Sequence, residues 1–145
     1  VLQAISKIIS DAIRGQDLAG RYGGEEFVVM LYNTSSDDAI VVAERIRKAI
    51  EDYAYEYEET ELHVTISIGI STLDMEKPVS AKQLVEYADR ALYQSKATGR
   101  NKVTLATKNM PPIKDGSICA FKSKSKSAKS STLKANSKLK TAQNQ

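Results

Sequence analysis

The chain has 145 residues, a formal net charge of +3 and a single cysteine. One cysteine excludes an internal disulfide and favours a reducing compartment. The chain has no apolar run long enough to span a membrane and does not begin with a secretory signal. These features predict a cytoplasmic location, although a longer parent protein would be free to attach to a membrane through upstream segments.

The first elements in chain order are a helix and a β-hairpin. Residues 1–14 predict a helix that ends at Gly15, because apolar residues recur on one helical face. Gly23 and Gly24 then separate two strand-like runs, and a tight two-residue turn needs the positive φ that glycine adopts freely. Glu25 and Glu26 follow directly. This turn suits either two solvated acids, or a site where phosphate approaches the backbone and oxygens hold a cation.

Two further helices and two strands follow the hairpin. Residues 35–53 predict a helix with an N-cap at its start, and residues 55–61 predict an acidic loop. Residues 62–70 alternate strictly between apolar and polar, which is typical of a half-buried strand. Ser80 to Gln83 form a capping box that opens a helix ending at Gly99, and residues 101–106 predict a last strand. This order indicates an α+β fold, with an antiparallel sheet covered by helices.

The end of the chain has a different composition. Residues 107–145 contain nine lysines and one acid, so they carry +8 and residues 1–106 carry −5. Because this stretch is Lys/Ser-rich and poor in large apolar residues, burial cannot offset its ordering entropy. We predict a folded unit over residues 1–106 and a disordered tail over residues 107–145. Its charge could attract nucleic acid or anionic lipid, but the scarcity of aromatic and arginine side chains favours a solvated tail and no nucleic-acid partner.

Four blocks of the sequence together resemble one known family. Residues 23–27 match the GGEEF variant of the motif that names the GGDEF family of diguanylate cyclases, and residues 14–17 fit its RxxD inhibitory motif. Residues 65–70 and 88–101 are similar to its later core strand and C-terminal helix. The resemblance implies a palm-like nucleotide cyclase fold. The family's DxDxFK strand and NxxxGHxxGD loop are missing, which implies an N-terminally truncated domain whose sheet lacks its middle strand.

The resemblance also implies a reaction. Family members condense two GTP molecules into cyclic di-GMP and two pyrophosphates as a homodimer, using Mg²⁺ or alternatively Mn²⁺. Glu25 is then the metal ligand and assists deprotonation of the attacking hydroxyl, with Glu26 in support. Gly23 and Gly24 let a phosphate approach the backbone amides.

Basic residues near the end of the third helix are the second part of the implied substrate site. Lys96 and Arg100, at i and i+4, would bind the β- and γ-phosphates in the family's manner. From the residues alone, they could equally interact with the C-terminus of their own helix.

The RxxD match implies control by product. Arg14 and Asp17, with Arg45 from the next helix, would bind cyclic di-GMP; otherwise they are solvated charges. An upstream sensory domain is expected in the parent protein. Because the missing motifs supply a second metal carboxylate and the guanine-binding residues, we expect the 145-residue chain to be inactive alone. The alternatives are a non-catalytic cyclic di-GMP receptor that binds through the RxxD site and, with no support from residues 1–106, a nucleic-acid-binding scaffold.

Overall fold

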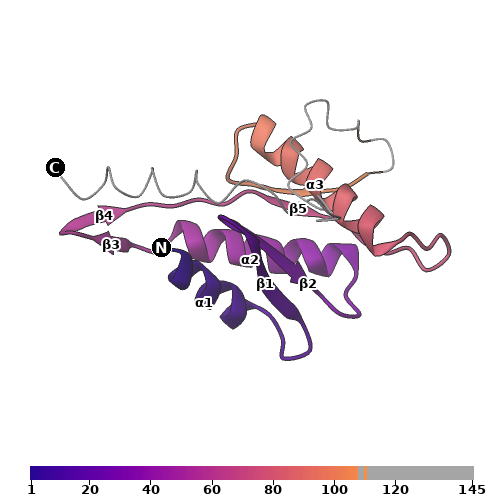
Figure 1. Ribbon diagram of the computed structural model, residues 1–145, viewed down its shortest axis with the longest axis horizontal. Helices are drawn as coiled ribbons and strands as arrows, with labels where there is room; N and C mark the ends of the chain where they lie inside the picture. The colour runs from indigo at the N-terminus through magenta and orange to yellow at the C-terminus, as the bar shows by residue number, and fades with distance from the viewer. Residues whose placement is uncertain (108–109, 111–145) are drawn as a thin grey trace, which may run out of the picture.

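The computed structural model describes residues 1–107 and 110 (Figure 1). Helices and short strands alternate along this part of the chain. In order they are α1 (Leu2–Ala12), β1 (Leu18–Gly23), β2 (Glu26–Met30), α2 (Ser36–Glu51), β3 (Tyr55–Tyr57), β4 (Thr60–Leu62), β5 (Ile68–Ile70), α3 (Ala81–Ala97) and β6 (Val103–Leu105). None of the helices in the described residues is long and apolar enough to cross a membrane.

The core forms where α1 meets α2. The buried side chains come from both helices and from the start of β3: Ile5, Ile9, Ile46, Ile50 and Tyr55. Half-buried residues of β2 and of the segment ending in β5 pack against this cluster: Phe27, Val29, Ile66 and Ile68. The hairpin and β5 therefore cover the same pair of helices, and burial of these side chains is what positions the hairpin.

Helix α3 lies on the other side of β5 and β6 from α2 (Figure 1). The Ser95 side chain is fully buried; its Oγ donates to the Ile68 carbonyl at 3.0 Å and lies 2.6 Å from Thr104 Oγ1. Gly69 allows this close approach, because a Cβ at that position would lie 2.1 Å from the Ala88 carbonyl oxygen. β5 and β6 thus lie between α2 and α3, which fixes α3 relative to the core.

Three separate strand pairs are present among the described residues. β1 pairs with β2 and β3 with β4, both antiparallel, whereas β5 pairs with β6 in parallel. β2 has no described partner besides β1, and β5 none besides β6. These open edges agree with the expectation for a sheet without its middle strand.

Most predicted elements are confirmed. The class is α+β; Ser35 caps α2 and accepts from the Asp38 amide, and Ser80 with Gln83 forms the capping box of α3. One expectation of the sheet needs correction, since the β5–β6 pair is parallel rather than antiparallel.

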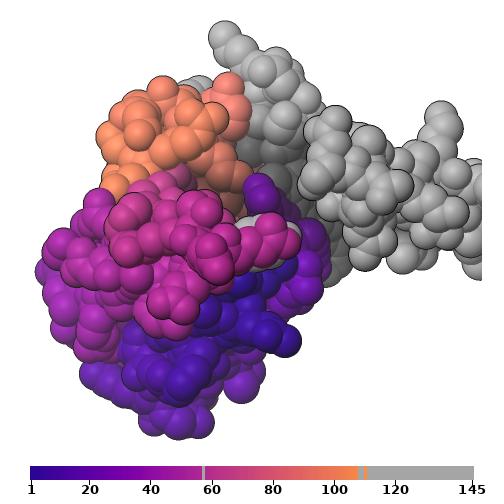
Figure 2. All heavy atoms as spheres, turned by 90° about the vertical axis from the view of Figure 1, so that its left-hand side faces the viewer, coloured from indigo at the N-terminus to yellow at the C-terminus, as the bar shows by residue number. Residues whose placement is uncertain are grey.

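Three boundaries also differ from the prediction. Helix α1 ends at Ala12 rather than Gly15, because the next residues enter a turn in which the Asp17 amide donates to the Arg14 carbonyl. The acidic segment expected to be a loop forms the β3–β4 hairpin, which projects from the body and faces the viewer in Figure 2. The long strand expected over residues 62–70 is divided into β4 and β5, because residues 63–67 find no strand partner in the described part. The tail predicted for residues 107–145 lies almost entirely outside the described residues.

Candidate functional site

The tip of the β1–β2 hairpin carries both glutamates of interest. Gly23 pairs with Glu26, so the two turn residues are Gly24 and Glu25 rather than the two glycines. The turn is shifted by one residue because the strand register changes between Arg21 and Gly23, a β-bulge. Gly24 has φ +55°, where a side chain would be strained. The Arg21 Nε donates to the Gly24 carbonyl at 2.7 Å and holds the turn from the side.

The two glutamates have different surroundings. Glu25 lies in the turn and is exposed, whereas Glu26 begins β2 and is half-buried. The turn therefore includes Glu25, and only Glu26 belongs to a strand. Glu25 is open to a ligand from solution, and Glu26 faces inward.

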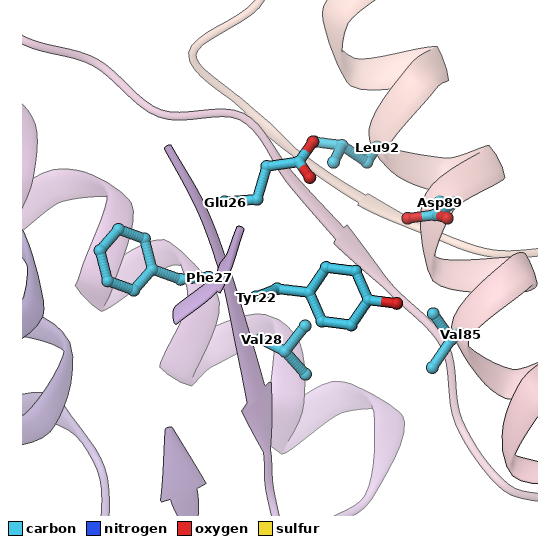
Figure 3. Close-up of a pocket in the computed structure, with 7 residues that line it drawn as sticks. All are labelled: Tyr22, Glu26, Phe27, Val28, Val85, Asp89 and Leu92. Carbon is cyan, nitrogen blue, oxygen red and sulfur yellow. The ribbon is translucent and has the colours of Figure 1, made fainter. Parts of the chain in front are cut away.

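Glu26 lines a pocket between the hairpin and α3 (Figure 3). Its walls are mainly apolar and aromatic and come from both elements: Tyr22, Glu26, Phe27, Val28, Val85, Asp89 and Leu92. Figure 3 shows the Glu26 and Asp89 carboxylates on opposite walls, with the Tyr22 ring reaching across toward α3. The two acids thus share one space.

Asp89 was not predicted from the sequence as a site residue. Its Oδ2 is buried and has no hydrogen-bond partner in the described part of the protein. Burial raises the pKa of the Asp89 carboxyl, the charge of Glu26 raises it further, and Lys96 acts in the opposite direction. The spacing of the sequence offered one signal. Asp89 lies four residues after Val85 and three before Leu92, so the acid shares a helical face with two apolar residues. An acid at such a position marks an unusual environment.

Among the described residues, no group of three or more His, Cys, Asp or Glu side chains could hold a metal ion. Mg²⁺, however, is commonly bound by one or two carboxylates together with substrate phosphates. The exposed Glu25 and the half-buried Glu26 provide carboxylate oxygens of that kind. The donors present therefore fit an ion shared with a phosphate rather than one enclosed by protein ligands.

The basic residues predicted for phosphate binding lie at the end of α3. Lys96 is exposed in the last helical turn, and Arg100 is exposed three residues beyond Ala97. Arg100 has φ +59° and its amide donates to the Ser95 carbonyl at 2.9 Å, which closes the helix after Gly99. Arg100 therefore lies beyond the end of α3, so the i, i+4 spacing does not place it on the same helical face as Lys96.

The predicted inhibitory residues gather at the end of α1. The Asp17 carboxylate is buried and accepts the amides of Arg14 at 2.9 Å and Tyr32 at 3.0 Å. These two bonds hold the pKa of Asp17 below its usual value. The Arg45 guanidinium donates to the Ala12 carbonyl, and the Arg14 side chain is exposed. The structure therefore brings the three together but uses both Asp17 oxygens within the fold.

Comparison with known proteins identifies the family. The profile of the family described as "Diguanylate cyclase, GGDEF domain" matches residues 1–102. Diguanylate cyclase A of Treponema denticola is 52% identical over 111 residues, which is 77% of this chain and 30% of that protein. The chain therefore spans less than a third of the length of this curated relative.

Solved structures agree with this assignment. The active GGEEF domain of a diguanylate cyclase from Vibrio cholerae is 28% identical with a TM-score of 0.66, covering 73% of this chain and 66% of that one. The GGDEF domain of DgcB from Caulobacter crescentus, in complex with c-di-GMP, is 26% identical with a TM-score of 0.66, covering 72% and 61%. By its sequence and its fold, this chain belongs to the GGDEF diguanylate cyclase domain family.

Proposed function

We propose that the protein to which this chain belongs condenses two GTP molecules into cyclic di-GMP and two pyrophosphates. The observation that carries this proposal is the hairpin tip, where a left-handed glycine precedes an exposed and a half-buried glutamate. Membership of the family and the similarity to Diguanylate cyclase A support it. Two copies, each holding one GTP, would present each 3′-hydroxyl to the α-phosphate of the other nucleotide, in the cytoplasm where GTP is available.

The residues of the hairpin have different roles in this reaction. The backbone at Gly23 and Gly24 is open to a nucleotide phosphate, because no atom outside their chain neighbours lies within 4 Å of a Cβ built at either position. Glu25 would hold Mg²⁺, or alternatively Mn²⁺, and assist removal of the hydroxyl proton. Glu26 supports it from the pocket. When bound, the ion stabilises the negative charge that develops on the phosphate and on the leaving pyrophosphate.

Lys96 and Arg100 would bind the terminal phosphates from the end of α3. Val85, Asp89 and Leu92 of α3 line the pocket beside the hairpin, and Lys96 follows Leu92 by one helical turn. A cation there lowers the energy of the leaving pyrophosphate. The chain alone has no DxDxFK carboxylate and no NxxxGHxxGD loop for guanine, so we expect the activity only in a longer protein.

A second function is a cyclic di-GMP receptor that uses Arg14, Asp17 and Arg45. The complex of the related DgcB domain with c-di-GMP favours product binding by this family. The exposed Arg14 and Arg45 suit phosphate recognition. Asp17 suits a guanine contact less well, because backbone amides already occupy both carboxylate oxygens. Product inhibition of an enzyme and pure reception would use the same three residues.

The test is the Glu25→Gln substitution in the longer protein. Loss of one charged ligand from a two-cation reaction should reduce cyclic di-GMP formation by about a hundredfold or more. Product is quantified by chromatography with GTP and Mg²⁺. Glu56→Gln, at an exposed acid of the β3–β4 hairpin, is the matched control and should retain full activity. A Glu25→Gln variant as active as this control would remove Glu25 from the mechanism.

A further inference from the structure

A side-chain network joins the middle of the chain to the loop after α3. The Arg47 Nη1 donates to the Asn101 Oδ1 at 2.8 Å, and the Asn101 Nδ2 donates to the Glu51 Oε1 at 2.7 Å. Arg47 also pairs with Glu51 at 2.9 Å and with Glu44 at 2.7 Å. We call Arg47, Glu51 and Asn101 the α2 clamp.

The chemistry of the clamp requires an amide at position 101. One atom of that side chain accepts from a cation and the other donates to a carboxylate. An aspartate there would face Glu51 with like charge. The Arg47 side chain is only 15% exposed, so its bonds are better shielded from water than those of a surface pair. The hydrogen bond from Asn101 is the main reason that the pKa of Glu51 lies below its usual value.

The clamp holds backbone that is otherwise unfavourable. Arg100 and Asn101 have φ +59° and +45°, the left-handed region that residues with a Cβ rarely occupy. The amide of Arg100 is fixed to the Ser95 carbonyl of α3, and the next residue is fixed to α2. Arg100 is therefore held from both sides, while no described residue bonds its exposed guanidinium. A free cation on a fixed backbone is preorganised for an anion.

We propose that Arg47, Glu51 and Asn101 are positioning residues that hold Arg100 ready to bind the terminal phosphates of the nucleotide. This inference rests on the proposed function, which places phosphate at Arg100. It adds that the phosphate site is built by α2 as well as by α3, through residues about fifty positions apart. Removing the clamp should weaken phosphate binding, and the whole loss should come from the misplaced Arg100 side chain.

The first measurement needs no ligand. Backbone ¹⁵N relaxation of the 145-residue chain reports order at Arg100 and Asn101, which should resemble rigid backbone with an order parameter of about 0.85. Arg47→Ala should lower it toward about 0.6 at these two positions. Arg47→Lys, which keeps the charge but not the fork, should give an intermediate value and guards against a variant that fails to fold. Lys7→Ala removes a cation from the exposed Lys7–Asp11 pair of α1 and should change nothing there. Unchanged order at Arg100 in Arg47→Ala overturns the proposal.

The second measurement uses inorganic tripolyphosphate as the probe in calorimetric titrations. Arg100→Ala should weaken binding about tenfold, as expected for one charge-assisted hydrogen bond. Arg47→Ala and Asn101→Gly should each weaken it about threefold to tenfold. Asn101→Gly tolerates the left-handed backbone but lacks the clamp, so it separates the bonds from the conformation.

A double-mutant cycle decides how the clamp acts. If it works through Arg100, Arg47→Ala should cause no further loss in the Arg100→Ala background. Additive losses, or full affinity in Asn101→Gly, would overturn the clamp while leaving Arg100 as a phosphate ligand. Wild-type affinity in Arg100→Ala would overturn both the clamp and the proposed phosphate role of Arg100. The Glu25→Gln assay tests the cyclase reaction separately.

Discussion

At the scale of single residues, Asp17 and Asp89 show that a shielded carboxylate can serve different purposes. Asp17 accepts two backbone amides and ties the end of α1 to the end of β2. Asp89 has an oxygen that is buried without any described partner and faces Glu26. The first contributes to folding, since its charged form is stabilised; the second costs stability and lies beside the proposed site.

Asp17→Asn should destabilise the fold in a pH-dependent manner. The pKa of Asp17 is lowered by the two amides, so its contribution is fully present above the unfolded-state pKa and is lost as pH falls through the folded-state pKa. The melting temperature of Asp17→Asn should therefore lie below that of the wild type at pH 7, and the gap should narrow in acid. Thermal unfolding followed by circular dichroism between pH 2 and pH 7 measures this, with exposed Asp37→Asn as control. A gap that does not change with pH would contradict the assigned role.

Tyr55→Phe should be neutral or stabilising by up to about 1 kcal/mol. The ring belongs to the core, but its hydroxyl is buried without a hydrogen-bond partner in the described residues. Removing the hydroxyl ends that desolvation cost while the ring contacts remain. Urea unfolding of the two proteins gives the difference in free energy of unfolding. A loss of more than about 1 kcal/mol would indicate a partner for the hydroxyl.

At the scale of elements, local signals determined what could be predicted. The starts of α2 and α3 were predicted because Ser35 and Ser80 cap their own helices within three residues. The β3–β4 hairpin was not, because Glu58 and Glu59 occupy left-handed turn positions where glycine or asparagine would normally signal a turn. The bulge that moves the β1–β2 turn by one residue was likewise not predicted, because no residue type in the sequence indicates it.

The packing of α3 on β5 provides a test at this scale. Gly69→Ala would bring a Cβ within 2.3 Å of the Leu92 amide nitrogen and 2.1 Å of the Ala88 carbonyl oxygen. Both atoms are backbone, so α3 must move, and the free energy of unfolding should fall by about 3 kcal/mol. Gly20→Ala is the matched control, because nothing lies within 4 Å of the added Cβ. Equal stability of the two variants in urea unfolding would show that α3 does not approach β5 so closely.

At the scale of the whole molecule, long-range pairs were beyond sequence reasoning. The resemblance led to Glu25, Glu26, Lys96 and Arg100 as site candidates, but the facing of Glu26 and Asp89 depends on how α3 docks. The bonds from Asn101 to Arg47 and Glu51 join residues 54 and 50 positions apart, for which a single sequence has no signal. The assembled fold also leaves the edges of β2 and β5 without described partners.

GTP turnover by the 145-residue chain, compared with that of a longer protein that also carries the DxDxFK and NxxxGHxxGD motifs, tests whether the hairpin and α3 need those motifs to form cyclic di-GMP. Both are incubated with GTP and Mg²⁺, and cyclic di-GMP is quantified by chromatography. We expect product from the longer protein and none from the chain alone, because the hairpin and α3 supply only part of the ligands for metal and guanine. Steady product formation by the 145-residue chain, in proportion to its concentration, would contradict this expectation, as would a longer protein that makes none.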